Sequence, residues 1–189
     1  MNNLNQRLDA FRDLVLDPQY VEGKGTGSDV DIRIFTYEPE EEMRVASFLE
    51  QQLFSKKLPN NGRVIGCNLY KTFIDICKDM DILDEIPNME KESGSAELLS
   101  SIHSAINAKN FVDKILETHE PRRGDVLILT GIGEVFPFMR IHMILNVVGE
   151  ELTAEFPIIA TYPGTYDGYN LKLFGKLAPI GYYRACNVV

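Results

Sequence analysis

The stretch TGIGEVFP, residues 130–137, comes closest in this chain to a chemical site. An apolar run precedes it, glycines occupy positions 131 and 133, and an apolar-periodic segment follows. This order is typical of a strand, a loop and a helix whose first backbone N–H groups bind a phosphate. The spacing therefore raises the question of whether the loop holds a nucleotide.

Two residues of this loop argue against a nucleotide. Phe136 stands at the third glycine position of G-x-G-x-x-G, where a side chain would hinder close packing of helix and strand. Glu134 places a carboxylate where a pyrophosphate would lie, and no Lys-Ser or Lys-Thr follows the glycines as in a Walker loop. We therefore expect a tight strand-to-helix turn, with a degenerate nucleotide-binding or enzymatic module on the Gly131 to Phe136 loop as an alternative.

A second loop, YPGTYDG at residues 162–168, follows the apolar run FPIIATY. In a parallel sheet both loops emerge at the carboxyl edge, where open α/β folds usually carry their sites. Its tyrosines offer rings and hydroxyls, and Asp167 offers one carboxylate. The loop is either a structured turn that contacts nothing or part of a protein-contact surface, because aromatic residues and arginine dominate interface energetics.

Signatures of other chemistry are absent from the sequence. The three histidines form no HxH or HExxH pattern, no G-x-S-x-G occurs, and the three cysteines are never arranged as CxxC. Asp29 and Asp31 flank a strand start, but two carboxylates are too few to indicate Mg²⁺. The sequence thus predicts no catalytic residue, no cofactor and no metal site, and nothing in these patterns requires chemistry.

Strand-like and helical patterns alternate along the chain. Helical spacing is found at residues 4–15, from Pro39, at 70–80, along one stripe at 98–116 and through 139–147, and strand patterns at 30–37, 63–69, 125–130 and 156–162. The helix after Pro39 should turn Met43, Ala46, Leu49, Leu53 and Phe54 inward. Alternating strands and helices predict an α/β fold with a mostly parallel central sheet and helices on both faces. Short β-like runs in the tail predict antiparallel edge strands at the C-terminus of a single domain, 1–189.

Composition and charge limit the partners. A hydrophobic content of 44% suits one soluble core, and 19 Lys and Arg against 28 Asp and Glu give a net charge of −9. Such a charge repels nucleic acid over a broad face. A DNA-binding adaptor remains a second alternative through local patches at Lys56, Lys57 and Arg63, or at Arg122 and Arg123. The start lacks a signal-peptide pattern and no long apolar run occurs, which predicts a cytoplasmic protein with no membrane contact.

Four stretches resemble the BrxB family of bacteriophage exclusion (BREX) defence systems. They are GTGSDVDIRIFTYEPEEE at 25–42, NLYKTFIDI at 68–76, LTGIGEVFPFMRIHMILN at 129–146, and PIIATYPGTYDGYNLKLFGKL from 157 with YYRA at 182–185. The stretches span most of the chain in the family's order. One departure is VDIRIFTY, where the family pattern leads us to expect a proline after the acidic position.

The resemblance implies a non-enzymatic component of a multi-protein antiphage complex that modifies host DNA and restricts phage. It implies a PglZ-type alkaline-phosphatase-like protein as the first partner to test, with a large ATPase and a DNA methyltransferase as further components. It supplies no catalytic residues to carry over.

The residues and the resemblance together predict a partner-binding surface at the carboxyl edge of the sheet. Its predicted members are Glu134, Phe136, Pro137, Arg140, Tyr162, Tyr166 and Asp167.

Overall fold

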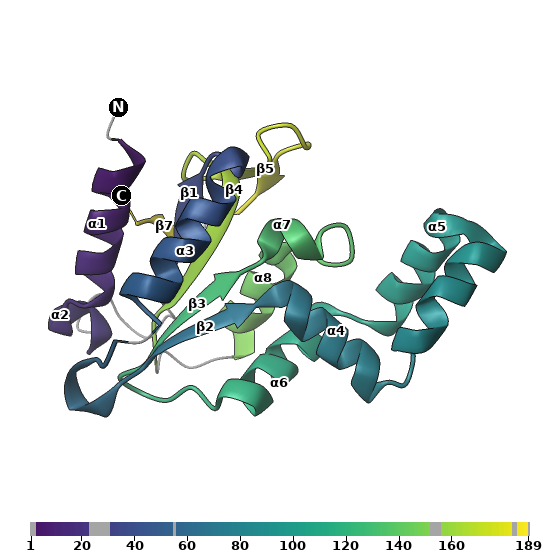
Figure 1. Cartoon of the computed structure of the whole chain (residues 1–189), viewed down its shortest axis with the longest axis horizontal. Coiled ribbons are helices and arrows are strands. Elements are labelled where there is room, and N and C mark those ends of the chain that lie inside the picture. The colour runs from purple at the N-terminus through teal and green to yellow at the C-terminus, as the bar shows by residue number, and fades with distance from the viewer. Residues whose placement is uncertain (1–2, 23–30, 55, 152–155, 183–184, 189) are drawn as a thin grey trace.

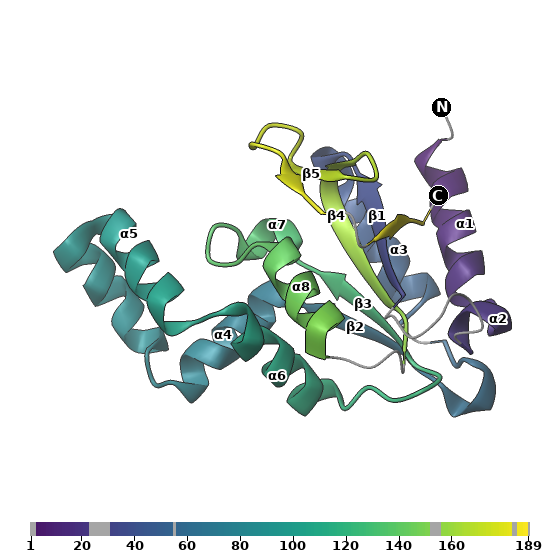
Figure 2. The same ribbon diagram turned by 180° about the vertical axis from the view of Figure 1, so that it is seen from behind.

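A twisted sheet lies between two groups of helices in the computed structural model of the chain (Figures 1 and 2). The structure describes residues 3–22, 31–54, 56–151, 156–182 and 185–188. Asp29 and the other residues before Asp31 in the stretch 25–42 lie outside these ranges.

Helices and strands alternate through the first two thirds of the chain, as predicted. The helices are α1 (Leu4–Val15), α2 (Pro18–Val21), α3 (Glu42–Gln52), α4 (Leu69–Asp79), α5 (Ile86–Ala105), α6 (Ala108–His119), α7 (Ile132–Val135) and α8 (Ile141–Glu151). The strands are β1 (Ile32–Tyr37), β2 (Val64–Asn68), β3 (Val126–Thr130), β4 (Ile158–Tyr166), β5 (Asn170–Leu173), β6 (Ile180–Gly181) and β7 (Cys186–Asn187).

The sheet has a parallel part and an antiparallel part. The parallel part runs in the order β2-β3-β4-β1-β7, and Ile158 on β4 pairs with Ile32 on one side and Leu127 on the other. β4 then continues beyond β3 and pairs antiparallel with β5, which pairs antiparallel with β6. The predicted α/β class, mostly parallel sheet and antiparallel C-terminal strands are confirmed.

Both faces of the sheet are covered, which explains the unbroken apolar run of β3. Leu127 and Leu129 point into a core with α4, α5, α6 and α8. Val126 and Ile128 point into a second core with α1, α2 and α3. The predicted helices on both faces are thus confirmed.

Two helix predictions need correction. The apolar stripe at 98–116 belongs to two helices, because Asn107 caps α6 through its side chain and ends the continuity with α5. α5 itself bends at Gly94, which has φ +83°, and projects from the body in both views (Figures 1 and 2). In α3, Leu49 is buried as predicted, but Met43 is 81% exposed and Ala46 is exposed too, because the buried face of the helix runs through Val45 and Leu49. Met43 precedes Val45 by two residues, which is about 200° around the helix.

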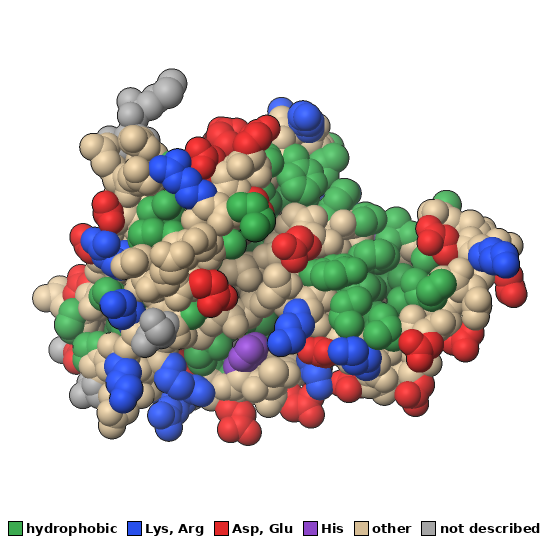
Figure 3. Space-filling view, viewed as in Figure 1, with side chains coloured by type: hydrophobic (Ala, Val, Ile, Leu, Met, Phe, Trp, Pro, Cys, Tyr) green, Lys and Arg blue, Asp and Glu red, His purple; other side chains and the backbone are tan. Residues whose placement is uncertain are grey.

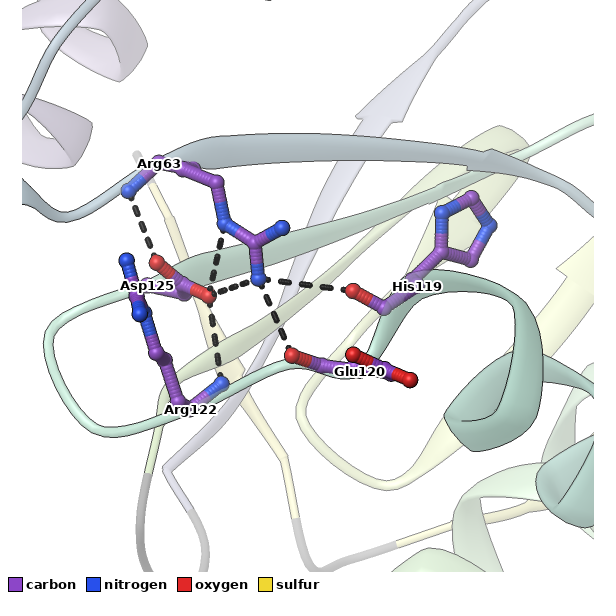
Figure 4. A network of polar contacts seen from close by, with 5 residues as sticks. All are labelled: Arg63, His119, Glu120, Arg122 and Asp125. Carbon is purple, nitrogen blue, oxygen red and sulfur yellow. Dashed lines mark hydrogen bonds and ion pairs between the residues drawn. The ribbon is translucent and has the colours of Figure 1, made fainter.

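A buried carboxylate joins β2 to β3 at their amino ends (Figure 4). Asp125 is 0% exposed, and its Oδ2 accepts from Nη2 of Arg63 at 2.6 Å and from the backbone N–H of Arg122 at 3.1 Å. The Arg63 backbone N–H donates to Oδ1 at 2.8 Å. The same guanidinium donates to the carbonyls of His119 and Glu120, at the end of α6. Burial by itself raises the pKa of Asp125, but the donors from Arg63 and Arg122 outweigh it and leave the pKa below the ordinary 3.8.

Replacing Arg63 by alanine should lower the free energy of unfolding by about 2 kcal/mol, because a buried carboxylate would lose its charged donor. Urea unfolding measures this change. Arg122→Ala is the matched control, since Arg122 contacts Asp125 through its backbone N–H. Equal losses in the two variants would contradict the role given to the Arg63 side chain.

The lowered pKa of Asp125 predicts a pH dependence of stability. A group whose folded pKa lies below its unfolded value stabilises the fold above the unfolded pKa and loses that contribution as the pH falls through the folded pKa. The advantage of the native chain over an Asp125→Asn variant should therefore shrink as the pH is lowered from about 6 to below 3.8. Denaturant unfolding at each pH measures it, and an advantage independent of pH would contradict the ionised state of Asp125.

Candidate functional site

The glycine-spaced loop is a single helical turn with protein side chains against both glycines. Gly131 has φ +70° and begins α7, and a Cβ there would lie 2.7 Å from Oδ1 of Asn68. A Cβ at Gly133 would lie 2.9 Å from the ring of Phe174. The expected strand-to-helix turn is present, but α7 ends at Val135, and the helix predicted through Met139 begins at Ile141. Close packing therefore accounts for the two glycines without a phosphate.

Carboxylates at the strand ends make this edge unfavourable for a phosphate. Asn68 donates from Nδ2 to Oε2 of Glu134 at 3.1 Å, and the Tyr37 hydroxyl donates to Oε2 of Glu42 at 2.8 Å. Burial raises the pKa of Glu42, and the charge of Glu134 raises it further against the hydrogen bond from Tyr37. Two carboxyl groups within electrostatic reach would repel an anion.

The segment YPGTYDG continues β4 as far as Tyr166, and the turn to β5 begins at Asp167. Tyr162 is 3% exposed and Tyr166 is 7% exposed. The Tyr166 hydroxyl lies within hydrogen-bonding distance of three carbonyls, the closest that of Ala185 at 2.8 Å. Packing against β5 and the C-terminal segment therefore buries the two rings that were expected at the surface.

Asp167 is exposed and shapes the turn between β4 and β5. Its Oδ1 accepts from the backbone N–H groups of Tyr169 at 2.9 Å and Asn170 at 2.7 Å. The bonds from Asn170, followed by that from Tyr169, hold the pKa of Asp167 below its ordinary value. The carboxylate is thus occupied in a local turn.

The remaining predicted members lie together on one exposed segment. Glu134, Pro137 and Arg140 are exposed, and Phe136 is half-buried. The Arg140 guanidinium carbon lies 5.5 Å from the centroid of the Phe136 ring. Phe136 meets Phe174 edge to face, with ring centroids 6.4 Å apart.

Three further aromatic residues were missed by the sequence reading. Phe174 contacts Phe136, Phe138 stacks on Phe73 with centroids 4.6 Å apart, and Tyr70 lies against the same Phe73 ring at 6.3 Å. Phe138 and Phe174 are half-buried, and Tyr70 is 39% exposed. The only available signal was the concentration of rings in VFPF and LYKTF, since the meeting of β5 with α7 is a long-range contact.

We call Tyr70, Phe136, Pro137, Phe138 and Phe174 the aromatic band. Figure 3 shows hydrophobic side chains gathered over this part of the surface, from beside β5 past α7 towards α5. The band joins elements that are far apart in sequence into one apolar surface. A surface of this kind is typical of protein-binding sites.

The structure also bears on a metal site, a membrane-spanning helix, the cysteines and DNA binding. No group of three or more His, Cys, Asp or Glu side chains in the described ranges could hold a metal ion. Among those same residues, no helix is both long and apolar enough to span a membrane. Burial raises the pKa of Cys67 and of Cys77 to about 11, whereas Cys186 is exposed. Among the basic residues considered for DNA binding, Arg63 forms an ion pair with Asp125.

A model of the family described as "BREX protein BrxB" matches residues 65–188. The chain belongs to the BrxB family. A BREX protein BrxB of Bacillus cereus (strain H3081.97) is 30% identical over 191 aligned positions, which cover 100% of this chain and 99% of that protein. A BREX protein BrxB of Escherichia coli O9:H4 (strain HS) is 25% identical, over 98% of this chain and 92% of that protein. No solved structure matches the chain significantly.

Membership of the BrxB family makes this a BREX-system protein and implies a role in phage defence. The matched range contains every residue of the aromatic band, together with Glu134 and Arg140. The stretch 25–42, which contains β1 and also resembles the BrxB family, lies outside that range. The alignments with the two relatives include it.

The packing role of Gly131 can be tested against a glycine of similar backbone conformation. Gly131→Ala should lower the free energy of unfolding by about 2–3 kcal/mol, because it strains φ and displaces Asn68, whose side chain also caps α4. Gly175→Ala, at φ +64° with no atom within 4 Å of the new Cβ, should lose about 1 kcal/mol. Denaturant unfolding compares them, and equal losses would refute the close contact with Asn68.

Proposed function

We propose that the chain is a non-enzymatic component of a BREX antiphage complex and that it acts by binding a partner protein on the aromatic band. This complex would lie in the cytoplasm, where host DNA is. The partner we assign first is the PglZ-type alkaline-phosphatase-like protein that the family resemblance implies. The ATPase and the DNA methyltransferase of the system would join the same assembly.

The aromatic band is the observation that carries this proposal. Its rings are held by one another and by Phe73, so they lose little conformational freedom when a partner covers them. Arg140 lies over Phe136 at the margin of the band. Large rigid rings beside an arginine are the composition that contributes most to binding energy at interfaces.

The strand ends favour a protein partner over a nucleotide. Asn68 and Phe174 fill the space beside Gly131 and Gly133 that a phosphate would need. Glu42 and Glu134 add negative charge at the same edge. A protein surface can contact the partly exposed rings without entering this acidic region.

The partnership is tested by co-purification of the full-length chain with the PglZ-type protein, followed by an affinity measurement. A Phe136→Ala, Arg140→Ala double variant should bind the PglZ-type protein at least about tenfold more weakly. Both substitutions truncate a side chain of a type, aromatic or arginine, that contributes strongly to binding energy at interfaces.

Met43→Ala is the control, since Met43 is 81% exposed on α3, which packs in the other core. Thermal unfolding must show that each variant is folded. Undiminished binding by the folded double variant, or loss of binding in the Met43 variant, would place the interface elsewhere.

A further inference from the structure

A pocket opens beside the aromatic band, between residues 132–142 and the β5–β6 hairpin. It contains about 380 Å³ of empty space, including open solvent at its mouth. Seven of its lining residues are large and aliphatic: Ile132, Met139, Ile141, Leu171, Leu173, Leu177 and Ile180. The cavity proper is about 30 Å³, well below the 300–1,000 Å³ of ligand pockets, so it can take the end of one side chain and not a helix.

Three polar side chains also line the pocket. Arg140 is exposed, and no carboxylate in the described part of the chain forms an ion pair with it. Burial lowers the pKa of His142, and the charge of Arg140 lowers it further, which keeps the imidazole neutral at pH 7. Burial raises the pKa of Tyr162, so its hydroxyl stays protonated. Arg140 therefore carries the only full charge among the lining side chains of this pocket.

The two walls have the opposite charge to the chain as a whole. Residues 132–142 and 171–180 carry the cations Arg140, Lys172 and Lys176 against one carboxylate, Glu134, which gives a net charge of +2. The whole chain has a net charge of −9. Of these cations Arg140 lines the pocket, whereas Lys172 lies between Leu171 and Leu173 on β5 and so on the opposite face of that strand. A guanidinium beside an apolar pocket complements a carboxylate of the ligand.

We infer that the pocket receives a large apolar side chain from an acidic segment of a partner protein, with a neighbouring carboxylate of that segment on Arg140. This inference rests on the proposed function, since it gives the chemistry of a segment that binds beside the aromatic band. The apolar walls supply burial for the anchor side chain. The Arg140 fork supplies a charge-assisted contact to the carboxylate.

A selection from a random peptide library against the immobilised full-length chain tests this inference without a chosen partner. Enriched peptides should combine a large apolar residue with adjacent Asp or Glu. Binding of a synthetic enriched peptide, followed by fluorescence anisotropy, should fall about tenfold in Arg140→Glu because the charge is reversed. It should fall to a similar extent in Ala178→Trp, because Ala178 lines the pocket and an indole there would fill it.

Ala46→Trp on α3 is the matched control, since Ala46 is exposed and α3 packs in the other core. The inference is overturned if no peptide is enriched, if enriched peptides lack acidic residues, or if Ala178→Trp binds them undiminished. Enrichment together with failure of the PglZ-type protein to bind would retain the pocket and reject that partner. Binding of the PglZ-type protein without enrichment would retain the proposed function and reject the pocket.

Discussion

The arrangement of the whole carboxyl edge depends on the length of β4. Its first residues pair with β1 and β3 at the centre of the parallel sheet, and its last residues pair with β5. Gly164 permits the change of partner, because a Cβ there would lie 2.3 Å from the carbonyl oxygen of Lys172. By extending past β3, β4 brings β5 back over α7, so that Phe174 reaches Phe136 and Leu171 and Leu173 form a wall of the pocket. The Phe136–Phe174 contact of the aromatic band and this wall of the pocket would be lost if β4 ended with its parallel neighbours.

The sequence predicted those parts of the fold that local patterns determine. The apolar run of β3 indicated a strand covered on both faces, and Leu127 and Val126 indeed point into different cores. The prediction failed where a cap or the choice of the buried helix face is not determined by composition. Asn107 divides one apolar stripe between α5 and α6, and the buried face of α3 runs through Val45 and leaves Met43 in solvent. Both outcomes depend on contacts that leave the hydrophobic composition of the helix unchanged.

The candidate site was only partly predictable, because its members are brought together by long-range packing. Glu134, Phe136, Pro137 and Arg140 are neighbours in sequence and remain neighbours on the surface. Tyr162 and Tyr166 were expected beside them, but β5 and the C-terminal segment cover both rings. Phe174 could not be placed from sequence, since its contact with Phe136 requires the hairpin at the end of β4. The glycines that suggested a phosphate loop instead accommodate Asn68 and Phe174.

In this BrxB-family protein the carboxyl edge of the sheet carries the acidic residues Glu42 and Glu134 at the strand ends and the aromatic band on its surface. This combination is suited to binding a protein. The central claim is that a partner covers the aromatic band and the adjoining pocket. Hydrogen–deuterium exchange of the full-length chain, alone and with the PglZ-type protein, tests it most directly. The account predicts slower exchange on complex formation at residues 132–142 and 170–181, with α1 and α3 unchanged. Protection confined to α1 and α3, with the carboxyl edge unchanged, would contradict it.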